Sequence, residues 1–188
     1  GVTRERDRAL AQLVRRGARV DLLQHALLRG DVVVRADRLR QLHGLGLAEL
    51  VLLPEQRRRV ARQRAAEAGC REVWQVDAEG LVTEGAGSNA YIVDGAGRVV
   101  TRPLGHEILG GVTREVVLEL ARREGIGVVE RPFTVEEAVS AREAFLTSTS
   151  SLVLPVTTID GKAVANGHPG LITTRLLELY RGHLMRVE

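Results

Sequence analysis

Three short segments of the chain combine residue types that could bind a charged small molecule. The first, residues 83–89, reads Thr-Glu-Gly-Ala-Gly-Ser-Asn and contains one carboxylate, that of Glu84. Glycine allows the backbone to approach a ligand closely, and a lone carboxylate beside it can hold a protonated ring nitrogen or a cation. A plain turn before a hairpin has the same composition, so this segment alone leaves both interpretations open.

The second and third segments are suited to phosphate. Residues 108–114 read Ile-Leu-Gly-Gly-Val-Thr-Arg, and Thr113 is the predicted N-cap of a following helix, whose free amides could bind an anion. Residues 147–151 read Thr-Ser-Thr-Ser-Ser, and hydroxyl groups at the end of a strand can donate to phosphate oxygens. An ordinary helix cap and a polar loop are the plainer interpretations of these two segments.

Together the three segments supply one carboxylate and two phosphate cradles, with no obvious nucleophile or base. That combination suits a cofactor with a ring nitrogen at one end and a phosphate at the other. Pyridoxal 5′-phosphate is such a molecule, and its chemistry requires a lysine as well as an acidic partner for the ring nitrogen. The chain contains a single lysine, Lys162, among 27 basic residues.

The pattern of the elements that must position these segments predicts a mixed α/β (α+β) fold. The interval 89–101 resembles a hairpin with a glycine-rich turn, and Thr134 with Glu137 forms a capping-box pattern. Strands are also predicted at 31–35, 72–76, 128–130, 143–147 and 151–159, and helices at 8–18, 55–68, 114–123 and 170–185.

Composition limits the classes of protein to consider. The 188 residues suggest one domain, or one domain plus a fragment, with a net charge of +7 over residues 1–70 and −4 over residues 71–188. No stretch approaches the ~20 apolar residues that span a membrane, and the arginine-rich start has no apolar core of a secretory signal. The single cysteine, Cys70, predicts neither a disulfide nor a cysteine-based metal site. We therefore expect a cytoplasmic protein without a membrane partner.

The three segments, in this order and spacing, resemble the class IV pyridoxal-phosphate aminotransferases. The resemblance includes Leu-Val-Thr-Glu-Gly-Ala-Gly-Ser-Asn at 81–89, residues 108–114, and Glu-Ala-Phe-Leu-Thr-Ser-Thr-Ser-Ser at 143–151 followed by Pro155 and Val156. It extends from about Leu53 to Tyr180 and is strongest to the D-amino acid (D-alanine) transaminases. Branched-chain aminotransferases and aminodeoxychorismate lyase share the implied fold, which is the large C-terminal domain of fold type IV.

The resemblance also implies residue roles and partners. Glu84 matches the acid that pairs with the pyridine nitrogen, and Leu109 matches the apolar residue that packs on the ring face. Backbone amides of Val112 and Thr113, with a second clamp from Thr149 and Ser150, match the phosphate site. No residue of a metal site is implied, the substrates are an amino acid and a 2-oxo acid, and the implied assembly is a homodimer. Ser88 and Asn89 are expected to shape the loop, and Arg114 is expected to be structural.

The family's Schiff-base lysine has no counterpart in this chain. Counting back from the helix that begins near residue 55 puts Val51 at its place, whereas anchoring on Leu-Leu-Pro at 52–54 puts Ala48 there. Lys162 follows Asp160 and Gly161 in a predicted exposed turn. We therefore identify no catalytic residue and expect negligible transamination by this chain.

The chain departs from the family in a second way, because no segment of it resembles the family's small N-terminal domain. We assign residues 1–50 to an arginine-rich segment with little family resemblance and residues 51–188 to the large domain. An out-of-frame stretch of a high-GC gene would explain both departures, and the alternative reading frames of the coding DNA test it. Another class of function is a nucleic-acid-binding module using the arginines at 57–59, 62 and 64. The absence of aromatic residues in 1–70 and the flanking acids disfavour it.

Overall fold

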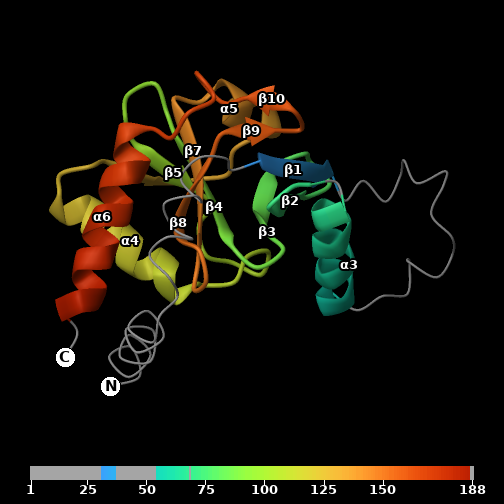
Figure 1. Ribbon diagram of the computed structural model, residues 1–188, viewed down its shortest axis with the longest axis horizontal. Helices are drawn as coiled ribbons and strands as arrows, with labels where there is room; N and C mark the ends of the chain where they lie inside the picture. Colours follow the sequence, from blue (N-terminus) through green and yellow to red (C-terminus); the bar gives the residue numbers. More distant parts are fainter. Residues whose placement is uncertain (1–30, 37–53, 68, 187–188) are drawn as a thin grey trace, which may run out of the picture.

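Two five-stranded sheets form the centre of the computed structural model, which describes residues 31–36, 54–67 and 69–186 (Figure 1). The first sheet has the order β10-β9-β1-β2-β3, and the second has the order β6-β5-β4-β7-β8. The strands are β1 (Asp31–Ala36), β2 (Glu72–Val76), β3 (Val82–Gly85), β4 (Asn89–Val93), β5 (Val99–Thr101), β6 (Val128–Glu130), β7 (Glu143–Ser148), β8 (Leu152–Val156), β9 (Thr158–Ile159) and β10 (Lys162–Ala163). The described helices are α3 (Pro54–Glu67), α4 (Val112–Arg123), α5 (Val135–Ser140) and α6 (Leu171–Arg186).

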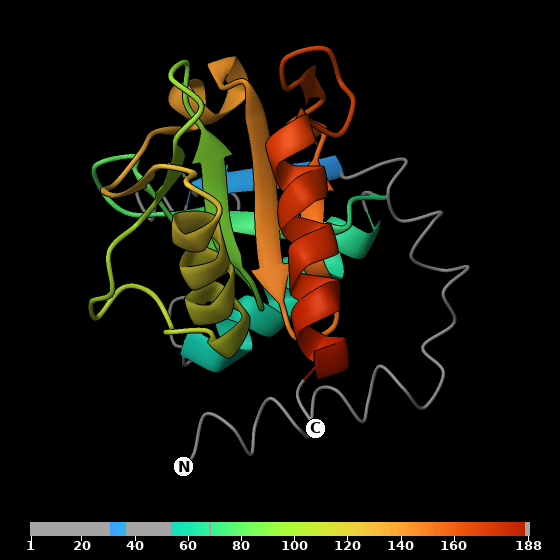
Figure 2. The same cartoon turned by 90° about the vertical axis from the view of Figure 1, so that its left-hand side faces the viewer.

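Helices α4 and α6 lie side by side over one face of the second sheet (Figure 2). Successive side chains on a strand point to opposite faces, so Tyr91, Val93 and Phe145 face these helices. There they pack with Val117 of α4 and Leu176 of α6, both buried. None of the helices in the described ranges is long and apolar enough to cross a membrane.

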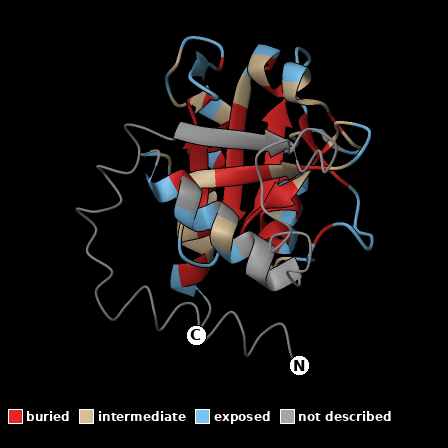
Figure 3. Ribbon diagram, turned by 90° about the vertical axis from the view of Figure 1, so that its right-hand side faces the viewer, coloured by how far each residue is buried: buried red, intermediate tan, exposed pale blue. Residues whose placement is uncertain are grey.

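The opposite face of the second sheet packs against the first sheet and α5. Ile92 and Leu146 point to this side, where Trp74 of β2 meets Phe133 edge to face with ring centroids 6.2 Å apart. Every residue of β4 and β8 is buried, so both strands are covered on both faces. Figure 3 shows that the strands at the centre of the molecule are largely buried. This double coverage explains why residues 90–93 and 152–156 have continuous apolar runs where a half-exposed strand would alternate.

Most predicted elements are confirmed. The mixed α/β fold is present, the hairpin pairs β4 with β5, and Thr134 caps α5 in a complete capping box with Glu137. β1, α3, β2, β6, β7 and α6 agree with the predicted ranges to within one residue at each end. The predicted helix at 8–18 lies outside the described residues.

The single strand predicted over residues 151–159 is wrong. The chain forms β8 in the second sheet, interrupts at Thr157, and continues as β9 in the first sheet. Thr157 is buried, and its carbonyl accepts a hydrogen bond of 2.9 Å from the N–H of Val164. Residues 152–157 are all buried, so burial does not change at the point where the chain leaves the second sheet.

Candidate functional site

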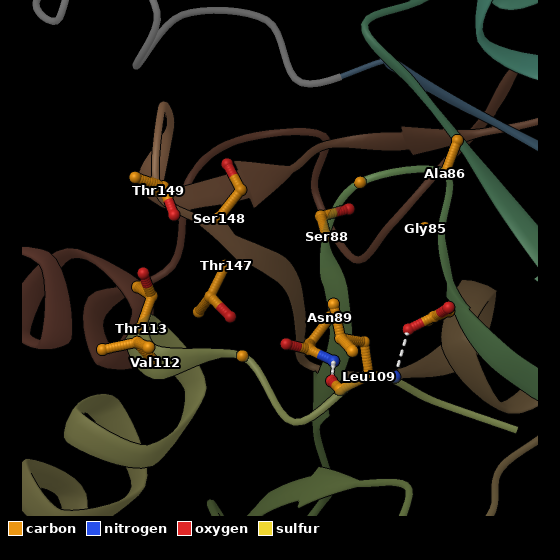
Figure 4. Close-up of a pocket in the computed structure, with 13 residues that line it drawn as sticks. Gly85, Ala86, Ser88, Asn89, Leu109, Val112, Thr113, Thr147, Ser148 and Thr149 are labelled. Carbon is orange, nitrogen blue, oxygen red and sulfur yellow. Dashed lines mark hydrogen bonds between the residues drawn. The ribbon is translucent and has the colours of Figure 1, made fainter. Parts of the chain in front are cut away.

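Glu84 lies on β3 and is 4% exposed. β3 pairs with β2, where Trp74 stands opposite Gly85, so the position of the Glu84 backbone is set by the sheet. Its Oε2 accepts the N–H of Leu109 at 2.7 Å, the bond ending at Leu109 in Figure 4. The carboxylate is thus held in one orientation at the wall of a cavity.

The glycine-rich loop makes a tight turn between β3 and β4. The N–H of Gly85 donates to the carbonyl of Ser88 at 2.7 Å, and the Ser88 hydroxyl donates to Glu72 Oε2 at 2.8 Å. A Cβ added at Gly85 would overlap the Ser88 Oγ. A Cβ at residue 85 would therefore require the Ser88 hydroxyl to move and its bond to Glu72 to change.

The N-terminus of α4 has backbone donors without a partner inside the helix. Gly111 is the N-cap residue and makes no side-chain capping bond, while the first intrahelical bond joins the Glu115 N–H to the Gly111 carbonyl. The amides of Val112, Thr113 and Arg114 precede that bond and have no acceptor within the helix. Val112 and Thr113 line the cavity, so this helix end is suited to an anion there.

The prediction that Thr113 caps this helix is wrong. α4 begins two residues before the predicted start at residue 114, at Val112, and Thr113 lies inside its first turn. Thr113 is 3% exposed, and its Oγ1 accepts the hydroxyl of Tyr180 at 3.4 Å. The hydroxyl therefore contacts α6, and the glycine at 111 leaves the amides uncapped.

The hydroxyl run begins within β7, which continues to Ser148. Thr147, Ser148 and Thr149 line the cavity, whereas Ser150 is exposed and is not among the lining residues. Ser148 Oγ accepts the Ser151 N–H at 3.0 Å and lies 3.3 Å from Ser150 Oγ. The turn after β7 is thus held by its own hydroxyls.

These segments meet in one cavity of about 150 Å³. In Figure 4, Val112, Thr113 and Thr149 gather at one side and Gly85 and Ala86 at the other. The predicted ring-end residues, Glu84 and Leu109, both line it, and so do all the predicted phosphate-binding residues except Ser150. The lining residues are Glu84, Gly85, Ala86, Gly87, Ser88, Asn89, Leu109, Gly111, Val112, Thr113, Thr147, Ser148 and Thr149.

Thr147 was not singled out from the sequence as a residue of the site. It is 1% exposed, and its Oγ1 lies 2.9 Å from the hydroxyl of Tyr91, a buried residue whose ring stacks on Phe145 at 4.5 Å. Thr147 is the first residue of the 147–151 hydroxyl segment, and it lines the cavity together with Ser148 and Thr149.

Tyr91 gives the first testable prediction. Burial raises the pKa of Tyr91 well above its usual range, against a smaller lowering by its hydrogen bond with Thr147. The unfolded chain releases this proton near pH ~10 while the folded chain keeps it. The resulting stability is therefore present below pH ~10 and lost as the pH rises beyond it.

In Tyr91→Phe we expect a free energy of unfolding about 1 kcal/mol lower near neutral pH, because the hydrogen bond with Thr147 is lost. Above pH ~10 the stability of the variant should decline less steeply with pH than that of the wild type. Urea unfolding of both proteins on either side of that pH measures the difference. Equal slopes would contradict the assignment.

Arg114 is buried and is not among the cavity-lining residues. Its Nη2 donates to the carbonyl of Arg102 at 3.0 Å and to Glu130 Oε2 at 2.8 Å. The hydrogen bond to Glu130 is the main cause of the lowered pKa of that carboxyl. These contacts tie α4 to the end of β6, and they fit the structural role expected for Arg114.

Lys162 is exposed on β10, which pairs with β9 across the predicted turn at Asp160 and Gly161. It is not among the residues that line the cavity. Ala48 and Val51, the two candidates for the lysine position, lie outside the described residues.

Comparison with known proteins gives one consistent family. The model of the family described as "Amino-transferase class IV" matches residues 34–159, more than half of the chain, and so begins upstream of the expected boundary at residue 51. A putative branched-chain-amino-acid aminotransferase of Methanocaldococcus jannaschii is 41% identical over 122 residues, which are 65% of this chain and 42% of that protein. A D-alanine aminotransferase of Bacillus licheniformis is 40% identical over 112 residues, 60% of this chain and 39% of that protein.

Solved structures agree. The branched-chain aminotransferase of the thermophilic archaeon Thermoproteus uzoniensis, solved with norvaline, superposes with a TM-score of 0.70 at 31% identity, covering 86% of this chain and 53% of that chain. The PLP-containing holo form of the branched-chain amino acid aminotransferase from Thermobaculum terrenum gives a TM-score of 0.72 at 28% identity, covering 88% and 54%. The chain thus spans about half the length of these structures, and the family and fold predicted from the sequence are confirmed.

Proposed function

We propose that this chain, which belongs to the class IV aminotransferase family, binds pyridoxal 5′-phosphate in the cavity between Glu84 and the start of α4. The observation that supports this most directly is the pairing of two features in one cavity. A buried, oriented carboxylate lies on β3, and an uncapped helix N-terminus belongs to α4. The residues fit the cofactor, because the carboxylate suits a protonated ring nitrogen and the helix N-terminus suits a phosphate.

At the ring end, Glu84 would accept a hydrogen bond from the pyridine nitrogen and keep it protonated. When bound, the cofactor supplies the electron sink for reactions at an amino acid's α-carbon. Leu109 is 68% exposed and lines the cavity, so a ligand in the cavity could contact its side chain. We assign Leu109 to the ring face, with its N–H orienting Glu84.

At the other end, the Val112 and Thr113 amides would donate to the phosphate. Thr149 and Ser150 form the proposed second clamp; Thr149 lines the cavity, and Ser150 is joined to the same turn through Ser148. The positive end of the α4 dipole adds to the attraction for the phosphate charge.

We propose that the reaction is the transfer of an amino group between an amino acid and a 2-oxo acid. We propose a D-alanine-like substrate, with branched-chain aminotransferase and aminodeoxychorismate lyase-like activities as the alternatives. The relatives bear both D-alanine and branched-chain names, so the choice of substrate rests on the motif resemblance. We also propose a cytoplasmic homodimer, with residues 51–188 as the cofactor-binding domain.

Covalent attachment is not part of this proposal. The resemblance puts Val51 or Ala48 at the place of the family's lysine, and neither side chain has an amine. We propose that the cofactor is held by Glu84, the α4 amides and the Thr149 turn alone.

A cofactor titration followed by absorbance tests the proposal, comparing the wild type with Glu84→Ala and Glu84→Gln. We expect the wild type to bind the cofactor saturably. Glu84→Ala should bind it at least about tenfold more weakly, because a hydrogen bond to a charged group contributes about 1.5–3 kcal/mol. Glu84→Gln retains the size and the acceptor for Leu109 but not the charge, and so should bind at an intermediate level. No saturable binding by the wild type, or equal affinities for all three proteins, would overturn the proposal.

A further inference from the structure

We infer that Asn89 is a positioning residue that fixes the spacing between the ring end and the phosphate end of the cavity. It is the first residue of β4 and is buried. This inference rests on the proposed cofactor site, and it concerns a residue that we do not expect to bond to the cofactor itself.

The first contact of Asn89 is with the ring end. Its Nδ2 donates to the carbonyl of Leu109 at 2.8 Å, and the N–H of the same leucine donates to Glu84 Oε2 at 2.7 Å. Both polar backbone groups of Leu109 are therefore engaged, one by each side chain. This pair of bonds joins Asn89 to Glu84 through the backbone of Leu109 (Figure 4).

The second contact is with the phosphate end. A Cβ added at Gly111 would overlap Asn89 Oδ1, while the next nearest atoms, Asn89 Cγ and Arg114 Cβ, would lie at 3.6 and 3.7 Å. The amide oxygen of Asn89 thus occupies the space beside the N-cap residue of α4. Close approach of this side chain to the helix start is possible because residue 111 is glycine.

The third contact is with the hydroxyl segment. Asn89 stands opposite Thr147 in the antiparallel pairing of β4 with β7, and both residues line the cavity. One buried amide therefore joins Glu84 through Leu109, borders α4 through Gly111, and is the sheet neighbour of Thr147. No regular element links the Leu109 loop to the helix start at this point, since residues 102–111 form neither helix nor strand.

A ligand that contacts both ends of a site binds tightly only when the two ends are correctly spaced, since the second contact is then intramolecular. A residue that sets spacing should therefore matter for pyridoxal 5′-phosphate but little for ligands that occupy one end. A residue that only stabilises the fold should affect every ligand alike. This difference separates positioning from a general structural role.

The experiment measures dissociation constants of pyridoxal 5′-phosphate, pyridoxal and inorganic phosphate for the full chain and for Asn89→Ala. We expect pyridoxal 5′-phosphate to bind about tenfold or more weakly to the variant, with less than about threefold change for the two one-ended ligands. Thr101→Val is the matched control, because it removes a buried side-chain bond to the carbonyl of Ala90 in the same sheet without lining the cavity. It should leave all three constants unchanged.

A double variant tests the contact with Gly111. Gly111→Ala alone should weaken pyridoxal 5′-phosphate binding because the new methyl group displaces Asn89. In the Asn89→Ala background the same substitution should cost little more, so the two effects should be non-additive. Thermal unfolding of each variant identifies any that fail to fold, and Asn89→Ser, which removes both the Nδ2 donor and the Oδ1 atom without adding charge, then substitutes for Asn89→Ala.

The outcomes distinguish this inference from the proposed function. Equal weakening of all three ligands by Asn89→Ala, or additive effects of the two substitutions, would overturn the positioning role while leaving the site in place. Failure of the wild type to bind pyridoxal 5′-phosphate more tightly than pyridoxal would instead overturn the proposed function.

Discussion

The chain mixed with pyridoxal 5′-phosphate, D-alanine and 2-oxoglutarate is expected to release pyruvate no faster than a protein-free mixture. In this chemistry a lysine both bonds to the cofactor's aldehyde and moves the proton at the substrate carbon. General acid–base catalysis alone contributes about 10²–10⁴-fold, and losing the covalent step adds to that loss. The one lysine, Lys162, is exposed on β10 and does not line the cavity.

A coupled pyruvate assay measures this, and borohydride reduction followed by peptide mass analysis checks for attachment. Lys162→Arg keeps the charge but removes the amine, so it should give the same background rate as the wild type. Steady pyruvate formation above the protein-free rate would refute the prediction, and reduction should fix no cofactor to residues 48–51, which contain no amine. A rate that falls with Lys162→Arg would show that this lysine acts where we expect no role.

The segments that supply the site could be predicted from the sequence because each has its chemistry in contiguous residues. Glu84 within its glycines and the Gly-Gly start of α4 are local patterns, and the structure places both on one cavity. Secondary structure was predictable for the same reason, as the capping box at Thr134 illustrates. Local patterns predict the parts of a site when the part and its signal lie within one turn or one strand.

What could not be predicted depends on contacts between segments. Thr113 looks like a cap in sequence, yet its hydroxyl is engaged by Tyr180, which is 67 residues away. Thr157 lies between β8 and β9, which belong to two different sheets. Asn89 is one polar residue at the end of a glycine loop, and its link to Leu109 spans 20 residues. A single sequence gives no signal for such pairings.

The second large effect concerns the α4 amides and is testable by removing a single N–H. Val112 is the first residue of the helix, a position where proline is well tolerated, so Val112→Pro deletes this donor and keeps the helix. The preceding residue, Gly111, has φ −72° and ψ 137°, a conformation that is favoured before proline. We expect pyridoxal 5′-phosphate to bind about 10- to 100-fold more weakly, since a hydrogen bond to a charged group contributes about 1.5–3 kcal/mol.

The matched control is Val112→Ala, which shortens the side chain but keeps the amide and should retain most of the affinity. Pyridoxal, which has no phosphate, should bind to Val112→Pro as it does to the wild type, whereas inorganic phosphate should bind more weakly. Isothermal titration of the three ligands provides these comparisons, and thermal unfolding should show a Tm for Val112→Pro near that of the wild type. Unchanged affinity for pyridoxal 5′-phosphate in a folded Val112→Pro would place the phosphate elsewhere, because the only group removed that could bind an anion is this amide.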